Sequence, residues 1–138
     1  MRRGENVMIT GKAGTGKSTL LRLFLEEADK GEVLVTAPTG VAALNVGGFT
    51  IHRAFGFRPG MYPDDIQPGG KWYGPSPVLS TAKVLVIDEI SMVRADLFDM
   101  MDIALRRARE VNLPFGGIQL ILVGDLLQLP PVVTDTER

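Results

Sequence analysis

The sequence predicts an α/β fold, a parallel sheet with helices on both faces, and two observations carry this prediction. Short apolar runs rich in β-branched residues alternate with stretches of helical periodicity, which is the pattern of β-α-β units. Each run is apolar at consecutive positions, as expected for a strand that helices cover on both sides. The predicted strands are Val7–Thr10, Val33–Thr36, Val84–Asp88 and Ile118–Val123.

Two long helices are predicted between these strands, because apolar residues recur there at helical spacing. The first, Lys17–Asp29, is followed by Gly31 as a stop signal. The second, Arg94–Arg109, has an Asp102–Arg106 pair at i,i+4 spacing on its solvent side. The apolar stripe of the second helix consists of Leu97, Met101, Ala104, Leu105 and Ala108.

The stretch from about residue 47 to 77 breaks this rhythm, since it is dense in glycine and proline. It leaves room for one short helix near Thr50–Phe55 and is otherwise predicted to be irregular. A long loop inside a compact domain is usually functional or mobile. Residues 1–138 are therefore predicted to form one domain with a Gly/Pro-rich irregular insertion at about 57–80.

The composition excludes several classes of protein. No apolar run reaches the roughly 18 residues that a membrane span needs, and the N-terminus lacks the apolar stretch of a signal peptide. The absence of cysteine excludes disulfides and fits an intracellular protein, in the cytoplasm or nucleoid of a bacterium or the nucleus or mitochondrion of a eukaryote. The net charge of −1 counts against binding of nucleic acid by bulk electrostatics, but it allows a few local phosphate contacts.

Residues 11–18 match the phosphate-binding pattern G-x-x-x-x-G-K-[ST], between a predicted strand and a predicted helix. Glycines let backbone N–H groups wrap a phosphate, and the helix N-terminus receives its charge. Lys17 would reach the β- and γ-phosphates, and the Ser18 hydroxyl would coordinate Mg²⁺. The alternative is a glycine-rich turn that matches by chance, but the flanking strand and helix favour a nucleotide site. The predicted cradle comprises Gly11, Ala13, Gly14, Thr15, Gly16, Lys17, Ser18 and Thr19.

Two adjacent acids, Asp88 and Glu89, follow the predicted strand that begins at Val84. The carboxyl ends of parallel strands are where α/β folds bind ligands. Asp88 would hold Mg²⁺ through water, and Glu89 would orient the attacking water. The alternative is a strand end capped by solvated acids, which is as plausible for the pair alone. Together with the phosphate-binding pattern, the pair favours ATP hydrolysis.

A glutamine, Gln128, follows the last predicted strand in the segment Gly124–Pro131. Pro130 and Pro131 stiffen this segment, so the Gln128 amide could sense the γ-phosphate. The alternative is a polar turn residue that satisfies backbone groups, and spacing alone does not separate the two.

Four segments resemble motifs I, Ia, II and III of superfamily 1 DNA helicases, in particular the Pif/RecD-type 5′-to-3′ branch. They are GKAGTGKST at 11–19, APTGVAALNVGGFTIH at 37–52, VLVIDEISMV at 84–93 and PFGGIQLILVGDLLQLPPV at 114–132. The resemblance implies a RecA-like P-loop NTPase fold that uses ATP and Mg²⁺. It implies that the strand before Gly124 lies between the P-loop strand and the Asp88 strand, which would bring Gln128 beside the γ-phosphate. It also implies that single-stranded DNA contacts Pro38, Thr39, Gly40, Thr50 and His52.

A physical argument supports that DNA site. Thr39 and Gly40 leave a predicted strand and open a predicted helix at Val41–Leu44, so free N–H groups there could bind a DNA phosphate without any lysine. The alternative for Thr39 is an ordinary N-cap, and His52 alone is more often a packed or surface histidine. Nearby aromatic residues could stack on bases or serve structure, by filling the core or pinning the loop. They are Phe49, Phe55, Phe57, and Trp72-Tyr73 beside Lys71.

Two parts of such a helicase are expected outside this sequence. The family's adenine-reading glutamine motif normally precedes motif I, and the ten residues before Gly11 contain no glutamine. The second RecA-like domain, with the arginine that completes the ATP site, would follow Arg138. The chain is therefore expected to be part of a longer motor and not to unwind DNA alone. The rival interpretations are another P-loop enzyme, AAA-type or a small-molecule kinase, and a module that binds nucleotide or DNA without useful turnover.

Overall fold

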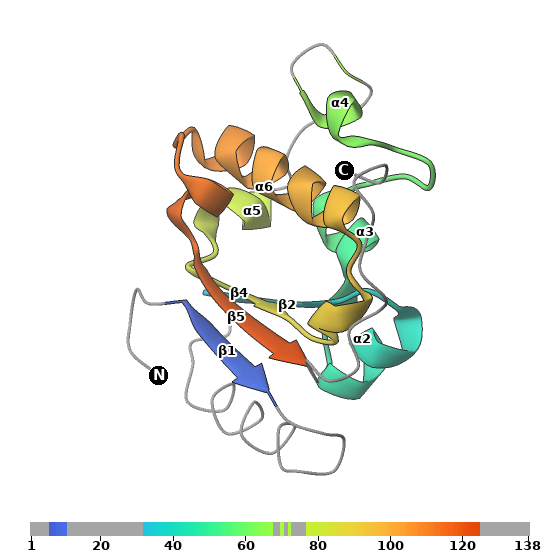
Figure 1. The fold of residues 1–138 in the computed structure, drawn as a ribbon. Helices are drawn as coiled ribbons and strands as arrows, with labels where there is room; N and C mark the ends of the chain where they lie inside the picture. Colours follow the sequence, from blue (N-terminus) through green and yellow to red (C-terminus); the bar gives the residue numbers. More distant parts are fainter. Residues whose placement is uncertain (1–5, 11–31, 68–69, 71, 73–76, 125–138) are drawn as a thin grey trace.

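Five parallel strands form one sheet in the order β1-β5-β4-β2-β3 (Figure 1). The structure is a computed structural model that describes residues 6–10, 32–67, 70, 72 and 77–124. The predicted strands are confirmed to within one residue at each end. The strands are β1 (Val7–Thr10), β2 (Val33–Ala37), β3 (Phe49–Thr50), β4 (Val84–Ile87) and β5 (Gln119–Gly124).

The position of β5 confirms the strand order that the helicase resemblance implies. β5 pairs with β1 on one side, where Thr10 lies opposite Gly124, and with β4 on the other, where Ile87 lies opposite Leu122. The strand before Gly124 therefore lies between the P-loop strand and the Asp88 strand. Because all pairs are parallel, every strand delivers its following residues to the same edge of the sheet.

The described helices confirm most of the predicted ones. The long second helix is α6 (Ala95–Arg109), with Arg94 as its N-cap. The helix expected to open near Val41 is α2 (Gly40–Val46), and the short helix expected near Thr50–Phe55 is α3 (Ile51–Phe55). The predicted helix Lys17–Asp29 lies outside the described residues.

The stretch predicted to be irregular contains two further helices, α4 (Pro63–Ile66) and α5 (Pro77–Thr81), and the prediction was wrong there. Both helices start at a proline, and proline is tolerated in the first turn because its missing N–H would have no intrahelical partner. In α4 the Asp65 carboxylate also accepts a hydrogen bond from the Tyr62 N–H at 2.9 Å. These two prolines therefore begin helices where composition alone suggested breaks.

The sheet separates two groups of buried side chains. On one face α3, α5 and α6 cover the larger group, which includes Leu85, Ile87 and Leu120 from the strands (Figure 1). On the other face Val86, Ile121 and Val123 are buried, with Val46 of α2 packed against them. Both faces of the central strands are covered, which explains why their sequences are apolar at consecutive positions.

Trp72 pins the segment after α3 onto the core. Its side chain is buried, and its Nε1 donates to the Phe55 carbonyl at 2.9 Å. The Arg107 guanidinium of α6 lies 5.2 Å from the Trp72 ring centroid and donates to the Ile66 carbonyl at 2.6 Å. Phe55 and Phe57 are buried beside it. Of the alternatives left open by the sequence, these three aromatic residues therefore serve structure; Lys71 and Tyr73 lie outside the described residues.

The predicted pair Asp102–Arg106 is confirmed, with 2.9 Å between Asp102 Oδ1 and Arg106 Nε. Its description as a pair on the solvent side was incomplete. The same Oδ1 accepts a hydrogen bond at 2.6 Å from the N–H of Phe115, in the 3-10 turn η2 (Pro114–Gly117). Asp102 therefore also ties the chain before β5 to α6.

Candidate active site at the carboxyl edge of the sheet

The predicted functional segments follow the carboxyl ends of the five strands. Along this edge, β1 leads to residue 11, β5 ends at Gly124, and β4 is followed by Asp88 and Glu89. β2 is followed by residues 38–40, and β3 runs into His52. Neighbouring strands lie about 4.8 Å apart, so the strand order determines which strand ends are neighbours along this edge. In the sequence, the segments predicted for ATP follow β1, β5 and β4, and those predicted for DNA follow β2 and β3.

The backbone of Asp88 is fixed by the neighbouring strand. Its N–H donates to the Thr36 carbonyl at 2.9 Å, which continues the β2–β4 ladder one residue beyond β4. Thr36 is itself fully buried, and its hydroxyl donates to the Val86 carbonyl at 2.8 Å. Asp88 is half-buried at the edge, in a place where a carboxylate can serve a cation without being sealed from water.

Glu89 adopts a left-handed backbone conformation, with φ 53° and ψ 47°. This conformation costs a non-glycine residue about 1–2 kcal/mol. It turns the chain away from the strand directly after Asp88 and into the 3-10 turn η1 (Ile90–Met92). The turn is closed by hydrogen bonds from Met92 N–H to the Glu89 carbonyl (2.9 Å) and from Val93 N–H to the Ile90 carbonyl (3.0 Å). Glu110 and Phe115 have the same conformation elsewhere in the described residues, so in Glu89 it marks a tight turn after the strand and not a function by itself.

Thr39 and Thr50 both act as helix N-caps. The Thr39 hydroxyl accepts from the Ala42 N–H, and the Thr50 hydroxyl accepts from the Arg53 N–H, each at 3.2 Å. The ordinary N-cap interpretation of Thr39 is therefore confirmed as its role within the fold. A capping hydroxyl still has its own hydrogen to donate, so the two roles are compatible.

The structure brings the two segments predicted for DNA side by side. Ala37 at the end of β2 pairs with Thr50 at the end of β3, so the turn at Thr39 and the start of α3 leave adjacent strands. Gly40 is exposed at the start of α2, in the first turn where helical N–H groups have no intrahelical acceptor. His52 is exposed, and its ring is perpendicular to the Phe57 ring, with 6.5 Å between the centroids.

One aromatic residue near this segment remains accessible. Phe49 is 50% exposed, and the Arg53 guanidinium lies 5.6 Å from its ring centroid. Sequence reasoning did not single out Arg53. The sequence did contain a signal for Arg53. It is a basic residue only three positions after Thr50, a predicted DNA contact, in a chain whose net charge is −1.

The cradle residues Gly11, Ala13–Thr19 and the glutamine Gln128 lie outside the described residues. Of the predicted ATP site, the structure therefore describes Asp88 and Glu89. Within residues 6–10, 32–67, 70, 72 and 77–124, no group of three or more His, Asp and Glu could hold a metal ion. In the same described ranges, no helix is long and apolar enough to cross a membrane.

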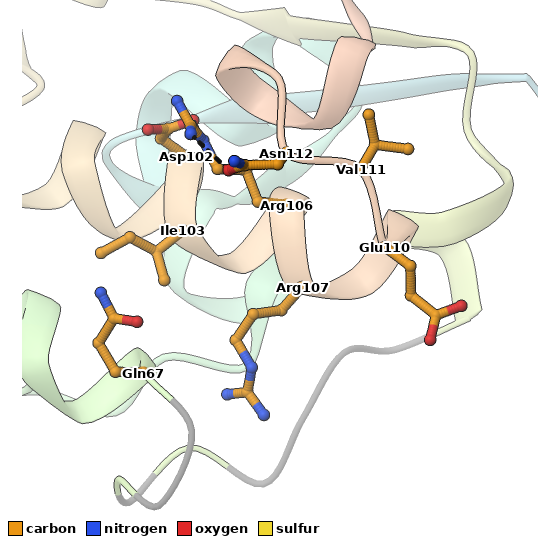
Figure 2. A pocket seen from close by; sticks show the side chains of 8 residues that line it. All are labelled: Gln67, Asp102, Ile103, Arg106, Arg107, Glu110, Val111 and Asn112. Atoms are coloured by element: carbon orange, nitrogen blue, oxygen red, sulfur yellow. Dashed lines mark hydrogen bonds and ion pairs between the residues drawn. The ribbon is translucent and has the colours of Figure 1, made fainter.

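A separate hollow of about 540 Å³ lies along α6 (Figure 2). Its two arginines are already engaged: Arg106 with Asp102 and Asn112, and Arg107 with the Ile66 carbonyl. None of the residues that line it belongs to the predicted site. They are Gln67, Asp102, Ile103, Arg106, Arg107, Glu110, Val111 and Asn112.

Comparison with known proteins decides the family. The model of the PIF1-like helicase family matches residues 1–138. The chain belongs to the PIF1-like helicases. This membership confirms the resemblance drawn from the four motifs, in preference to an AAA-type protein or a small-molecule kinase.

Individual PIF1-like helicases match almost the whole chain. The human ATP-dependent DNA helicase PIF1 is 44% identical over 143 residues, which cover 98% of this chain and 21% of the human protein. The ATP-dependent DNA helicase RRM3 of Saccharomyces cerevisiae is 41% identical over 145 residues, covering 100% of this chain and 20% of that protein. The chain thus spans about a fifth of the length of these relatives.

Solved PIF1-like structures share the fold. A crystal structure of Pif1 helicase from Bacteroides in complex with ADP-AlF3 and ssDNA aligns with a TM-score of 0.79 and 44% identity. The alignment covers 98% of this chain and 32% of the Bacteroides chain. Pif1 helicase from Candida albicans aligns with a TM-score of 0.73 and 42% identity, covering 94% of this chain and 31% of that one. The RecA-like fold implied by the resemblance is thereby confirmed.

Proposed function

We propose that the chain is the ATP-binding and ATP-hydrolysing core of a 5′-to-3′ DNA helicase that translocates on single-stranded DNA. One observation carries the proposal: in the sheet order β1-β5-β4-β2-β3, the three strands that the proposed ATP segments follow are neighbours, and so are the two strands that the proposed DNA segments follow. Asp88 and Glu89 directly follow β4, which pairs with β2, the strand that the first proposed DNA segment follows. Family membership supports the same reading.

In this proposal each residue of the ATP site has a separate task. Gly11, Ala13, Gly14, Thr15, Gly16 and Thr19 shape the phosphate cradle, and Lys17 neutralises phosphate charge. Ser18 and Asp88 hold Mg²⁺, which when bound supplies charge neutralisation on the β- and γ-phosphate oxygens. Glu89 orients and polarises the attacking water, and Gln128 senses the γ-phosphate. The relative from Bacteroides was crystallised with ADP-AlF3, which supports a nucleotide as a ligand of this chain.

The DNA segments take part through local phosphate contacts. We assign these contacts to Pro38, Thr39, Gly40, Thr50 and His52, which follow the adjacent strands β2 and β3. N–H groups of a first helical turn and threonine hydroxyls bind phosphate without a basic surface, which agrees with a net charge of −1. The Bacteroides relative was crystallised with single-stranded DNA.

The chain acts, in this proposal, as part of a longer intracellular protein. The relatives are about five times longer, and the remaining helicase domains would supply an arginine to the transition state. Such an arginine contributes on the order of a thousandfold or more to the hydrolysis rate. The 138-residue chain alone should therefore bind nucleotide with little turnover. Binding without useful turnover is the second candidate function.

The test compares two glutamates that share one backbone conformation. Glu89→Gln in the full-length protein should retain ATP binding and lose hydrolysis, because it keeps the shape and removes the water-orienting carboxylate. Glu110→Gln is the matched control, since Glu110 also has a left-handed backbone (φ 54°) but lies exposed at the C-cap of α6. Nucleotide binding and phosphate release are measured on the same preparations. Hydrolysis at the control rate by Glu89→Gln would refute the assignment.

A further inference from the structure

The backbone conformation of Gly124, the last residue of β5, does not require a glycine. The described glycines with positive φ are Gly47, Gly56, Gly60, Gly116 and Gly117, and Gly124 is not among them. A glycine in a strand without that need marks the close approach of another part of the chain. A Cβ added at Gly124 would lie 2.9 Å from Ile90 Cγ2 and 3.2 Å from the Ile90 nitrogen.

The part that approaches is the turn η1, which starts immediately after Glu89. Within the described residues, the side chain of Ser91 in this turn makes no hydrogen bond, although it is only 8% exposed. The turn's own hydrogen bonds, Met92 to Glu89 and Val93 to Ile90, close it internally. Its place relative to β5 is therefore set by packing, and the missing side chain of Gly124 lets it lie directly on the strand end.

Gly124 also has a defined place relative to β1 and β4. It pairs with Thr10, the last residue of β1, and its strand lies between β1 and the strand β4 that leads to the Glu89 turn. A side chain at position 124 would push the turn away from the end of β5. Glu89, which joins this turn to β4, would move with it.

We infer that Gly124 is a positioning residue for Glu89: the absence of a side chain there lets the turn η1 lie on the end of β5 and so sets where the Glu89 carboxylate lies at this edge of the sheet. The inference rests on the role proposed for Glu89 in hydrolysis. Carbon atoms in contact prefer about 3.5–4.0 Å, so a Cβ at 2.9 Å requires a shift of roughly half an ångström or more. Catalytic groups tolerate about 0.5 Å, and a misplacement of about 1 Å costs about a hundredfold in rate.

Gly124→Ala in the full-length protein should therefore lower kcat for ATP hydrolysis about 10- to 100-fold, while KM for ATP changes less than about threefold. Gly116→Ala is the control for lost stability. It lies before β5, near the opposite edge of the sheet, with φ 63°, and its added Cβ would be 2.6 Å from the Leu105 carbonyl. It should lower the melting temperature and leave kcat of the folded protein unchanged. Gly124→Ala with a control-like kcat, or with a raised KM alone, would overturn the inference.

A second substitution tests whether the contact with Ile90 is the cause. Ile90→Ala removes Cγ2, the nearest atom, and keeps the backbone nitrogen at 3.2 Å. Gly124→Ala should lower kcat in both backgrounds, but the fold-decrease in the Ile90→Ala background should be less than about a third of the fold-decrease in the protein that keeps Ile90. A double-mutant cycle measures this coupling between the two positions. An equal effect in both backgrounds, or failure of Gly124→Ala to fold in both, overturns the inference. If Glu89→Gln hydrolyses ATP normally, the proposed function fails first; if Glu89→Gln is inactive and Gly124→Ala is normal, only this inference fails.

Discussion

Replacing Glu89 by glycine should stabilise the chain and abolish ATP hydrolysis at the same time. The left-handed backbone of Glu89 (φ 53°) costs a residue with a Cβ about 1–2 kcal/mol, and glycine is free of this cost. Glycine also loses about 0.5–1 kcal/mol more conformational entropy on folding. The net gain in unfolding free energy is therefore about 0.5–1 kcal/mol.

The matched variant is Glu89→Ala, which removes the same carboxylate but keeps a Cβ in the left-handed conformation. An unfolding entropy of about 2.1 cal/mol/K per residue converts the expected difference into about 2–3 °C of melting temperature for 138 residues. Thermal unfolding of the 138-residue chain, followed by circular dichroism, measures this difference. Glu110→Gly against Glu110→Ala should show the same sign, because Glu110 has φ 54°.

Hydrolysis separates the two positions. In the full-length protein both Glu89 variants should be inactive, whereas both Glu110 variants should hydrolyse ATP normally. Equal melting temperatures for Glu89→Gly and Glu89→Ala would refute the strain argument. Activity of either Glu89 variant would refute the catalytic one.

Three further predictions concern the ligands. The 138-residue chain should bind ATP and GTP weakly and alike in the presence of Mg²⁺, because residues 1–10 contain no glutamine that could read adenine. Calorimetry showing strong ATP preference would contradict this, and Lys17→Ala should abolish binding of both. Single-stranded DNA should bind with a shallow salt dependence. Two or three phosphate contacts, at about −0.7 per phosphate, give a slope of roughly −1.4 to −2.1 when the logarithm of the binding constant is plotted against the logarithm of the salt concentration. A slope several units steeper would reveal a basic surface. Gln128→Ala in the full-length protein should leave ADP binding nearly intact and remove DNA stimulation of ATP hydrolysis, because a hydrogen bond to the γ-phosphate is worth about 1.5–3 kcal/mol. Unchanged stimulation with a lowered melting temperature would make Gln128 a turn residue only.

The elements that the sequence predicted well are those whose signal is local. The central strands and α6 carry their own periodicity, and the turn residues that bound them lie next to them. β3 was missed because two residues hold no pattern, and its existence depends on pairing with β2. The prolines that begin α4 and α5 count as breakers in a composition but fit a first helical turn.

The parts of the site that sequence reasoning did not reach depend on distant contacts or on strain. Asp88 and Glu89 could be proposed from the sequence because adjacent acids after an apolar strand are visible there. The left-handed conformation of Glu89 was not, since glutamate has no preference for it. A side chain at position 124 would collide with Ile90, which lies 34 positions earlier in the chain. No local sequence pattern reports such a distant contact.

The chain has a single tryptophan, and its surroundings make it an internal reporter of folding. The Trp72 indole is buried, tied to the Phe55 carbonyl and covered by the Arg107 guanidinium of α6. A shielded indole fluoresces at shorter wavelength than one in water, so detachment of this segment from α6 should shift the emission to the red. In the 138-residue chain, variants at Gly124, Glu89 or Lys17 can therefore be checked for an intact core by their emission spectrum, without any label.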